Sequence, residues 1–181
     1  MPLSAPDIKI STGIDTPRVD AQGFRSAMRI VATAVTVIAT GEAGLRHGMT
    51  ASAVCSLSDR PPMILACVNS NSTVLPHIRA NGCFSANFLT ETQSALAERF
   101  AGLTKVYGPD RFEAEIWGQL VTGAPVLHDA LSVFDCRLEC EYDSPTHTIL
   151  IGRVEGMMHD PLARSLVYAG GHFSFPHHLA T

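Results

Sequence analysis

Charged residues are scarce in this chain. Asp, Glu, Lys and Arg together make up 17% of its 181 residues, and the formal net charge is −4 at pH 7. No run of Lys or Arg stands out, which argues against a surface that binds duplex nucleic acid. No apolar stretch approaches the roughly 20 residues that a membrane-spanning helix needs. We therefore expect a soluble protein that binds neither nucleic acid nor membranes.

Targeting signals and several common catalytic motifs are also missing. Residues 1–20 have no apolar core of a signal peptide, so we expect a cytoplasmic protein. Without H-E-x-x-H or paired C-x-x-C motifs, and with His177 and His178 adjacent near the end of the chain, no metal site is predicted. The absence of G-x-S-x-G, G-x-G-x-x-G and G-x-x-x-x-G-K-[ST] argues against a serine hydrolase of that type, the usual dinucleotide fold and a P-loop.

Cysteine is present, but in no pattern that suggests a framework of disulfides. The five cysteines are an odd number, and the closest pair, Cys136 and Cys140, is not a C-x-x-C motif. All five, which also include Cys55, Cys67 and Cys83, occur in apolar or alternating segments. Free cysteine is among the most buried residue types, so we expect buried, reduced thiols.

Hydrophobic residues make up 46% of the chain, and the length suits one domain. We expect an N-terminal arm (1–20), a single domain (21–175) and a C-terminal tail (176–181). Asp20 is placed to cap the first helix, whose apolar stripe would hold Phe24, Met28 and Val31. The patterns predict helices at 21–32, 72–80 and 93–102, and strands at 33–40, 49–58, 63–68, 83–89, 132–142, 147–159 and 166–173.

This order of elements favours a mainly β fold with inserted helices. Strands and helices do not alternate strictly, which argues against a doubly wound parallel sheet and favours an antiparallel barrel or sandwich. Residues 103–125 are expected to be irregular. The segment 132–142 alternates well and would place Cys136 and Cys140 on the core face, with Asp135 on the opposite face.

Hydroxyl side chains give the strongest candidate for a ligand site. Thr50, Ser52, Ser56 and Ser58 are spaced by even numbers, so one continuous strand would project them to the same side. Ser72 and Thr73, at a predicted helix start, could add donors for a phosphate. The alternative is that these hydroxyls bond to neighbouring backbone. His147, which opens a predicted strand, and His172, which follows two glycines, could each bind a ligand or be ordinary surface residues.

Several blocks of the chain resemble the short-chain flavin reductases, the small partners of two-component flavin-dependent monooxygenases. The longest is GMTASAVCSLSDRPPMILACVNSNSTVLPHIRANGCFSANFL, residues 48–89. The resemblance continues through LAERFAG, DRFEAEIW, GAPVLHDAL, SPTHTILIGRV and LVYAGGHF, and covers roughly residues 21 to 174. The order and spacing of these blocks are more specific than any single motif.

The resemblance implies an antiparallel Greek-key split β-barrel of the FMN-binding type that works as a homodimer. It also implies NADH- or NADPH-dependent reduction of FMN or FAD, with a flavin-dependent monooxygenase as partner. His147 would orient the nicotinamide. The residues that would line the cofactor sites are Gly48, Met49, Thr50, Ser52, Ala53, Cys67, Val68, Asn69, Ser72, Thr73, Phe100, Ala101, Tyr168 and His172.

The chain departs from the family pattern at two places. Many members carry Gly-Asp-His where Pro145, Thr146 and His147 stand here, and Tyr-x-Arg-Gly-x-Tyr where residues 168–173 read YAGGHF. An arginine at position 170 could pair with a nucleotide phosphate. Two other functions therefore stay open: a flavoprotein that retains its flavin and reduces a corrinoid or an iron complex, and a non-enzymatic flavin-binding module.

Overall fold

The computed structural model describes residues 19–113 and 116–176. Most of the expected arm and tail, with His177 and His178, lies outside the described residues. The helices are α1 (Ala21–Ile30), α2 (Leu75–Asn81), α3 (Ser94–Phe100) and the 3-10 turn η1 (Gly108–Arg111). The strands are β1 (Thr33–Ala34), β2 (Thr36–Thr40), β3 (His47–Ala51), β4 (Val54–Asp59), β5 (Pro62–Asn69), β6 (Cys83–Phe88), β7 (Trp117–Gln119), β8 (Pro125–Leu127), β9 (Ser132–Asp143), β10 (His147–His159), β11 (Val167–Ala169) and β12 (His172–Ser174).

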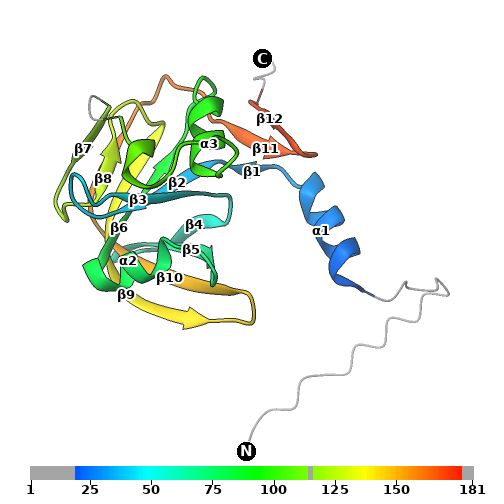
Figure 1. The fold of residues 1–181 in the computed structure, drawn as a ribbon, viewed down its shortest axis with the longest axis horizontal. Helices are drawn as coiled ribbons and strands as arrows, with labels where there is room; N and C mark the ends of the chain where they lie inside the picture. Colours follow the sequence, from blue (N-terminus) through cyan, green and yellow to red (C-terminus); the bar gives the residue numbers. More distant parts are fainter. Residues whose placement is uncertain (1–18, 114–115, 177–181) are drawn as a thin grey trace, which may run out of the picture.

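The main sheet is antiparallel and seven-stranded, in the order β3-β2-β6-β9-β10-β5-β4. Its two edge strands, β3 and β4, are consecutive in the chain and are joined only by Ser52 and Ala53. Three chain steps span at most about 11 Å, so the sheet must curl until its edges approach each other. Figure 1 shows this curled sheet, with β3 close to β4 and β5. The mainly β, antiparallel fold with few helices is as predicted.

Two apolar cores lie on either side of β2, which is buried along its whole length. Val37 and Ala39 belong to one core, where α3 and the β7–β8 hairpin cover the sheet, and Ile38 belongs to the other. Opposite faces of one strand thus pack into two different cores, as a central strand covered on both sides requires.

Helix α2 closes one end of the curled sheet. Leu75 and Ile78 are buried in the second core. Outside that core, Arg79 Nε donates to Glu141 Oε1 over 2.9 Å, and the His77 ring stacks on His47 with centroids 3.4 Å apart. Burial first, and then the neighbouring His77, lower the pKa of His47, which favours a neutral His47 ring at pH 7.

Several predicted boundaries need correction. The predicted strand 49–58 is broken at Ser52–Ala53, so Ser56 and Ser58 lie on a different strand from Thr50. A shift in the pairing of β4 with β5 lies between Ser56 and Ser58, so the four hydroxyls do not form one row. The second helix begins at Leu75 rather than Ser72, the segment 103–125 contains η1, β7 and β8, and residues 166–173 form the β11–β12 hairpin rather than one strand.

The first helix is confirmed, but its packing is not. Asp20 caps α1 by accepting a hydrogen bond from the Gly23 N–H. The predicted stripe is nevertheless solvent-exposed, since Phe24 is 59% and Met28 is 49% exposed. In Figure 1 the helix projects from the sheet beside β11 and β12. Its apolar face has no cover within the described chain.

The cysteines are free, as predicted, but they are not uniformly buried. Cys83 and Cys136 are buried, Cys67 and Cys140 are partly buried, and Cys55 is exposed. Burial, with Asp135 nearby, raises the pKa of Cys136 to about 12, so this thiol is inert at neutral pH.

Asp135 is the clearest exception to the predicted alternation of 132–142, because it is fully buried. Its carboxylate accepts hydrogen bonds from the backbone N–H groups of Val121 and Thr122 over 2.7 Å, and from the Thr122 hydroxyl. The side chain thereby fixes the turn between β7 and β8, which explains why a charge is tolerated at a core position. Among the described residues, none of the helices has the length and hydropathy for crossing a membrane.

Candidate functional site

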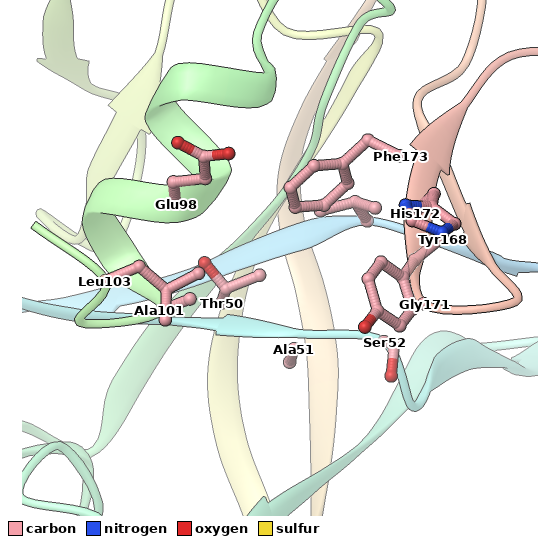
Figure 2. A pocket seen from close by; sticks show the side chains of 11 residues that line it. Thr50, Ala51, Ser52, Glu98, Ala101, Leu103, Tyr168, Gly171, His172 and Phe173 are labelled. Carbon is pink, nitrogen blue, oxygen red and sulfur yellow. The ribbon is translucent and has the colours of Figure 1, made fainter. Parts of the chain in front are cut away.

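A cavity of about 640 Å³ opens between β3, the C-terminal end of α3 and the β11–β12 hairpin. Its volume lies within the range of small-ligand pockets. The lining residues come from four separate parts of the chain, and Figure 2 draws them with all but Val35 labelled. They are Val35, Thr50, Ala51, Ser52, Glu98, Ala101, Leu103, Tyr168, Gly171, His172 and Phe173.

An aromatic wall stands on one side of this cavity. Tyr168 and Phe173 are directly paired across β11 and β12, so their side chains share one face of the hairpin. Their rings meet edge to face with centroids 5.5 Å apart. Gly170 and Gly171 form the turn with positive φ angles of 61° and 90°, a conformation that glycine adopts without strain. The hairpin thus holds two half-buried rings toward β3 (Figure 2).

The end of edge strand β3 forms the opposite wall. Thr50 Oγ1 donates to the Ala97 carbonyl of α3 over 2.6 Å, which ties the helix to the strand. One of the predicted hydroxyls therefore bonds to backbone, which was the alternative interpretation. Ser52 is exposed at the break after β3 and also faces the cavity. In Figure 2 the hydroxyl end of Tyr168 lies near Ser52 across the opening.

Helix α3 supplies the third wall. It buries Leu96, Ala97 and Phe100 and leaves Glu98 and Ala101 exposed, three positions apart on one helical face. Glu98 is the only acidic side chain among the lining residues, and neither Lys nor Arg lines this cavity. Apart from the imidazole of His172, the other lining side chains are apolar or carry a hydroxyl group. The cavity is therefore suited to an uncharged ring system rather than to a phosphate.

The structure brings five of the predicted cofactor residues to this one cavity: Thr50, Ser52, Ala101, Tyr168 and His172. Ala53, the next residue of the β3–β4 link, lines a neighbouring cavity that also includes Ser52 and Tyr168.

Three other predicted residues have no side chain available to a ligand here. Val68 and Phe100 are 0% and 2% exposed and belong to the two cores. Gly48 is buried against the rings of Phe100 and Phe112. Any contact between these residues and a ligand would have to involve the backbone. Phe100 packs in the core next to Ala101 and does not itself close the cavity.

The remaining predicted residues gather near the end of β5, outside the cavity. Ser72 Oγ donates to Met49 Sδ over 3.2 Å, and the Asn69 side chain accepts a hydrogen bond from the Asn71 N–H. Thr73 is exposed on the same loop, and Cys67 is partly buried on β5. Burial and the nearby Cys55 raise the pKa of the Cys67 thiol, so it is protonated at neutral pH and is a poor nucleophile.

His147 belongs to this second group. It opens β10 opposite Asn69, is exposed, and its Nδ1 lies 2.9 Å from Thr146 Oγ1. It is not among the lining residues of the cavity within one chain. The predicted metal-free character of the chain remains a prediction, although the described residues contain no cluster of three or more His, Cys, Asp or Glu suited to a metal.

Sequence reasoning did not single out four lining residues: Val35, Ala51, Glu98 and Leu103. Gly171 and Phe173 belong to the 168–173 segment, which the family resemblance assigns to the nicotinamide nucleotide. Glu98 carried a usable signal, because it lies one helical turn before Ala101. Val35 carried no such signal. It lies between β1 and β2 in an apolar run, and only the folding of the chain brings it to the cavity.

Comparison with known proteins finds a matching family model and similar proteins. A family model described as Flavin reductase like domain matches residues 28–176. The chain is 43% identical over 159 residues to the FMN reductase (NADH) RutF 2 of Methylorubrum extorquens, covering 88% of this chain and 91% of that protein. It is 38% identical over 168 residues to the FMN reductase (NADH) RutF of Variovorax paradoxus, covering 93% of this chain and 87% of that protein.

Solved structures give the same picture. BorF, the flavin reductase component of a bacterial two-component tryptophan halogenase, superposes with a TM-score of 0.79 at 31% identity and covers 86% of this chain and 98% of its own. The NADH:FAD oxidoreductase SgcE6 of Streptomyces globisporus gives a TM-score of 0.80 at 27% identity, with 90% and 98% of the two chains covered.

Gly48→Ala tests whether the aromatic cluster holds β3 in place. A Cβ at this position would lie 2.7 Å from Phe100 Cε1 and 3.0 Å from Phe112 Cζ, so the strand or the rings must shift. We expect the free energy of unfolding in urea to fall by about 1–3 kcal/mol. Ligand binding in the cavity that Thr50 lines should also weaken. Gly156→Ala is a control for the loss of a strand glycine, because neither glycine has a positive φ and the nearest atom to an added Cβ at position 156 is Val121 Cγ2 at 3.1 Å. Equal losses in the two variants would contradict the packing argument.

Proposed function

Because the chain belongs to the flavin reductase like domain family, we propose that it transfers reducing equivalents from NADH to FMN and releases reduced flavin to a separate monooxygenase. The donor and the flavin follow the relatives named FMN reductase (NADH). The separate acceptor follows BorF, which serves a two-component halogenase. The observation that carries the proposal is the cavity where five sequence-predicted residues meet beside two aromatic rings.

The residues of the cavity fit planar rings. Tyr168 and Phe173 offer ring faces and edges, and Ala51 and Ala101 leave room on the opposite side. When bound, the flavin supplies the hydride-accepting chemistry and the dihydronicotinamide supplies the hydride. The chain's own task is to hold two rings in contact and to exclude water between them.

No side chain needs to act as a general acid or base in this reaction. Thr50 Oγ1 already donates to Ala97, so it positions α3 rather than a proton. Glu98 and His172 are exposed at the cavity and are available to polar groups at the edges of the ligands. The shape of the cavity and the polar side chains at its opening would therefore decide which ligands bind.

The sheet order supports the finer fold class as part of this proposal. Joining β3 directly to β4 across a curled seven-stranded sheet is compatible with an antiparallel Greek-key split barrel. In this assignment the split lies between the two edge strands, and Ser52 and Ala53 bridge it. The cavity opens beside that bridge.

A homodimer completes the proposal. The exposed stripe of α1, with Phe24, Met28 and Val31, is the kind of apolar surface that needs a partner. A second copy of the chain is the occupant that the family resemblance implies. Its approach would also decide where His147 acts, because this residue lies outside the cavity of its own chain.

The first prediction concerns the reaction itself. Anaerobic mixing of the protein and added FMN with NADH should bleach the flavin absorbance rapidly, whereas NADPH should act more slowly. Protein purified without bound flavin should oxidise NADH only after flavin is added. Stoichiometric bound flavin that turns over with an added corrinoid or iron complex would instead favour the retained-flavin alternative. Bound flavin that neither nucleotide bleaches would leave only the non-enzymatic binding module.

His147→Ala tests the orienting role. Loss of one hydrogen bond to the nicotinamide should lower kcat/KM for NADH about tenfold, with flavin affinity unchanged. His159→Ala is the matched control, because His159 is exposed at the opposite end of the same strand. An unchanged kcat/KM in the His147 variant would remove this residue from the site.

Sedimentation velocity tests the dimer. The wild-type chain should sediment as a dimer at micromolar concentration, and Phe24→Asp should shift it to a monomer by burying a charge in the interface. Ile30→Asp introduces the same charge about 120° away around the helix from Phe24, at a residue that is 74% exposed, and should leave the dimer intact. A monomeric wild type would overturn the assignment.

A further inference from the structure

Helix α1 directs a polar face toward the body of the protein. A second cavity, of about 910 Å³, lies between this helix and the β3–β4 link. The helix contributes Gln22, Arg25, Ser26 and Arg29 to its wall, together with the apolar Met28 and, at the end of the helix, Val31. At 100° per residue, the four polar residues share one side of the helix, away from Phe24. All four are solvent-exposed, so their polar groups are available to a ligand in this cavity.

The two guanidinium groups in this wall have no carboxylate partner among residues 19–113 and 116–176. Elsewhere in that range, arginine is usually paired: Arg79 with Glu141, Arg99 with Glu113 and Arg164 with Glu91 are examples. Arg25 and Arg29 make no such pair. Two uncompensated positive charges one helical turn apart, beside a concave surface, form an environment that favours an anion.

Arg29 is also fixed in place against the aromatic hairpin. Its carbonyl accepts a hydrogen bond from the Gly170 N–H over 2.8 Å. Its guanidinium lies over Gly171, where an added Cβ would come within 2.6 Å of Nε. A side chain at position 171 would displace the guanidinium from this place. The turn between β11 and β12 therefore positions the arginine next to the first cavity, which Gly171 also lines.

The two cavities are neighbours. Ser52 and Tyr168 line both of them, so they form the border between an uncharged ring cavity and a cationic one. A ligand with a ring at one end and phosphate groups at the other could occupy both. The ring of such a ligand would lie in the first cavity, and its negatively charged phosphates would lie beside the arginines of the second.

We propose that Arg25 and Arg29 form a binding site for the diphosphate of the nicotinamide dinucleotide, adjacent to the cavity that holds its ring. This proposal rests on the proposed function, because it takes the hydride donor as the occupant. The diphosphate carries two negative charges, and guanidinium groups bind phosphate oxygens through paired hydrogen bonds. The first cavity offers only the carboxylate of Glu98 as a formal charge, so the diphosphate is accommodated on the α1 side.

Charge-removing variants test the site. Arg25→Gln and Arg29→Gln should each raise KM for NADH about tenfold, with kcat for FMN reduction nearly unchanged, because the lost contacts are with a part of the donor that does not react. Arg29→Lys should lose less, since it keeps the charge. Increasing ionic strength should raise KM of the wild type more steeply than that of the double variant. Arg60→Gln, which removes an exposed positive charge outside both cavities, should have no effect.

A hydride donor without phosphate separates binding of the diphosphate from general damage. With 1-benzyl-1,4-dihydronicotinamide, the arginine variants should reduce FMN as fast as the wild type. Equal losses with both donors would overturn the site and indicate a structural role. A higher KM for FMN with unchanged KM for NADH would also overturn it, in favour of the flavin phosphate. If the wild type reduces FMN with neither donor, the proposed function itself fails, whereas an active wild type with unaffected variants refutes only the diphosphate site.

Discussion

The two-residue link between β3 and β4 is the constraint on which the rest of the structure depends. Because Ser52 and Ala53 join opposite edges of a seven-stranded sheet, the sheet has to curl. The Ala53 carbonyl accepts a hydrogen bond from the Cys67 N–H over 2.9 Å, which anchors the link to β5. Both cavities then open at this link, since Ser52 lines each of them.

The link is precise only because the strand before it is held from behind. Gly48 packs directly on the rings of Phe100 and Phe112, and Thr50 bonds to the backbone of α3. Trp117 completes this aromatic cluster, with its ring centroid 4.9 Å from that of Phe112. Rigid packing of this kind transmits small displacements instead of absorbing them. The position of the ligand-facing residues is therefore a property of the first core rather than of β3 alone.

The sequence predicted elements that local periodicity determines and failed where tertiary contacts decide. Strands β9 and β10 and the Asp20 cap follow from alternation and capping chemistry, and the structure confirms them. The burial of Asp135 depends on a turn more than ten residues earlier in the chain, so no local pattern reveals it. Likewise, the break at Ser52 falls within a segment whose evenly spaced hydroxyl residues resemble one continuous strand. Thr50, Ser52 and His172 are candidates from residue type and spacing, but only the family resemblance groups them with Ala101 and Tyr168, because periodicity cannot bring four distant segments together.

The orientation of α1 shows how a site can depend on a surface that looks unfavourable by itself. If the polar face turns toward the second cavity, Phe24 on the other side of the helix turns outward, where it is 59% exposed. Exposed apolar area such as Phe24 is costly for an isolated chain, whereas the exposed guanidinium groups of Arg25 and Arg29 are solvated and available to an anion. A second copy against Phe24 would remove the apolar cost, and an anionic ligand against Arg25 and Arg29 would hold the polar face toward the cavity. Dimer formation and donor binding are then linked through one helix, because each stabilises the orientation that the other requires.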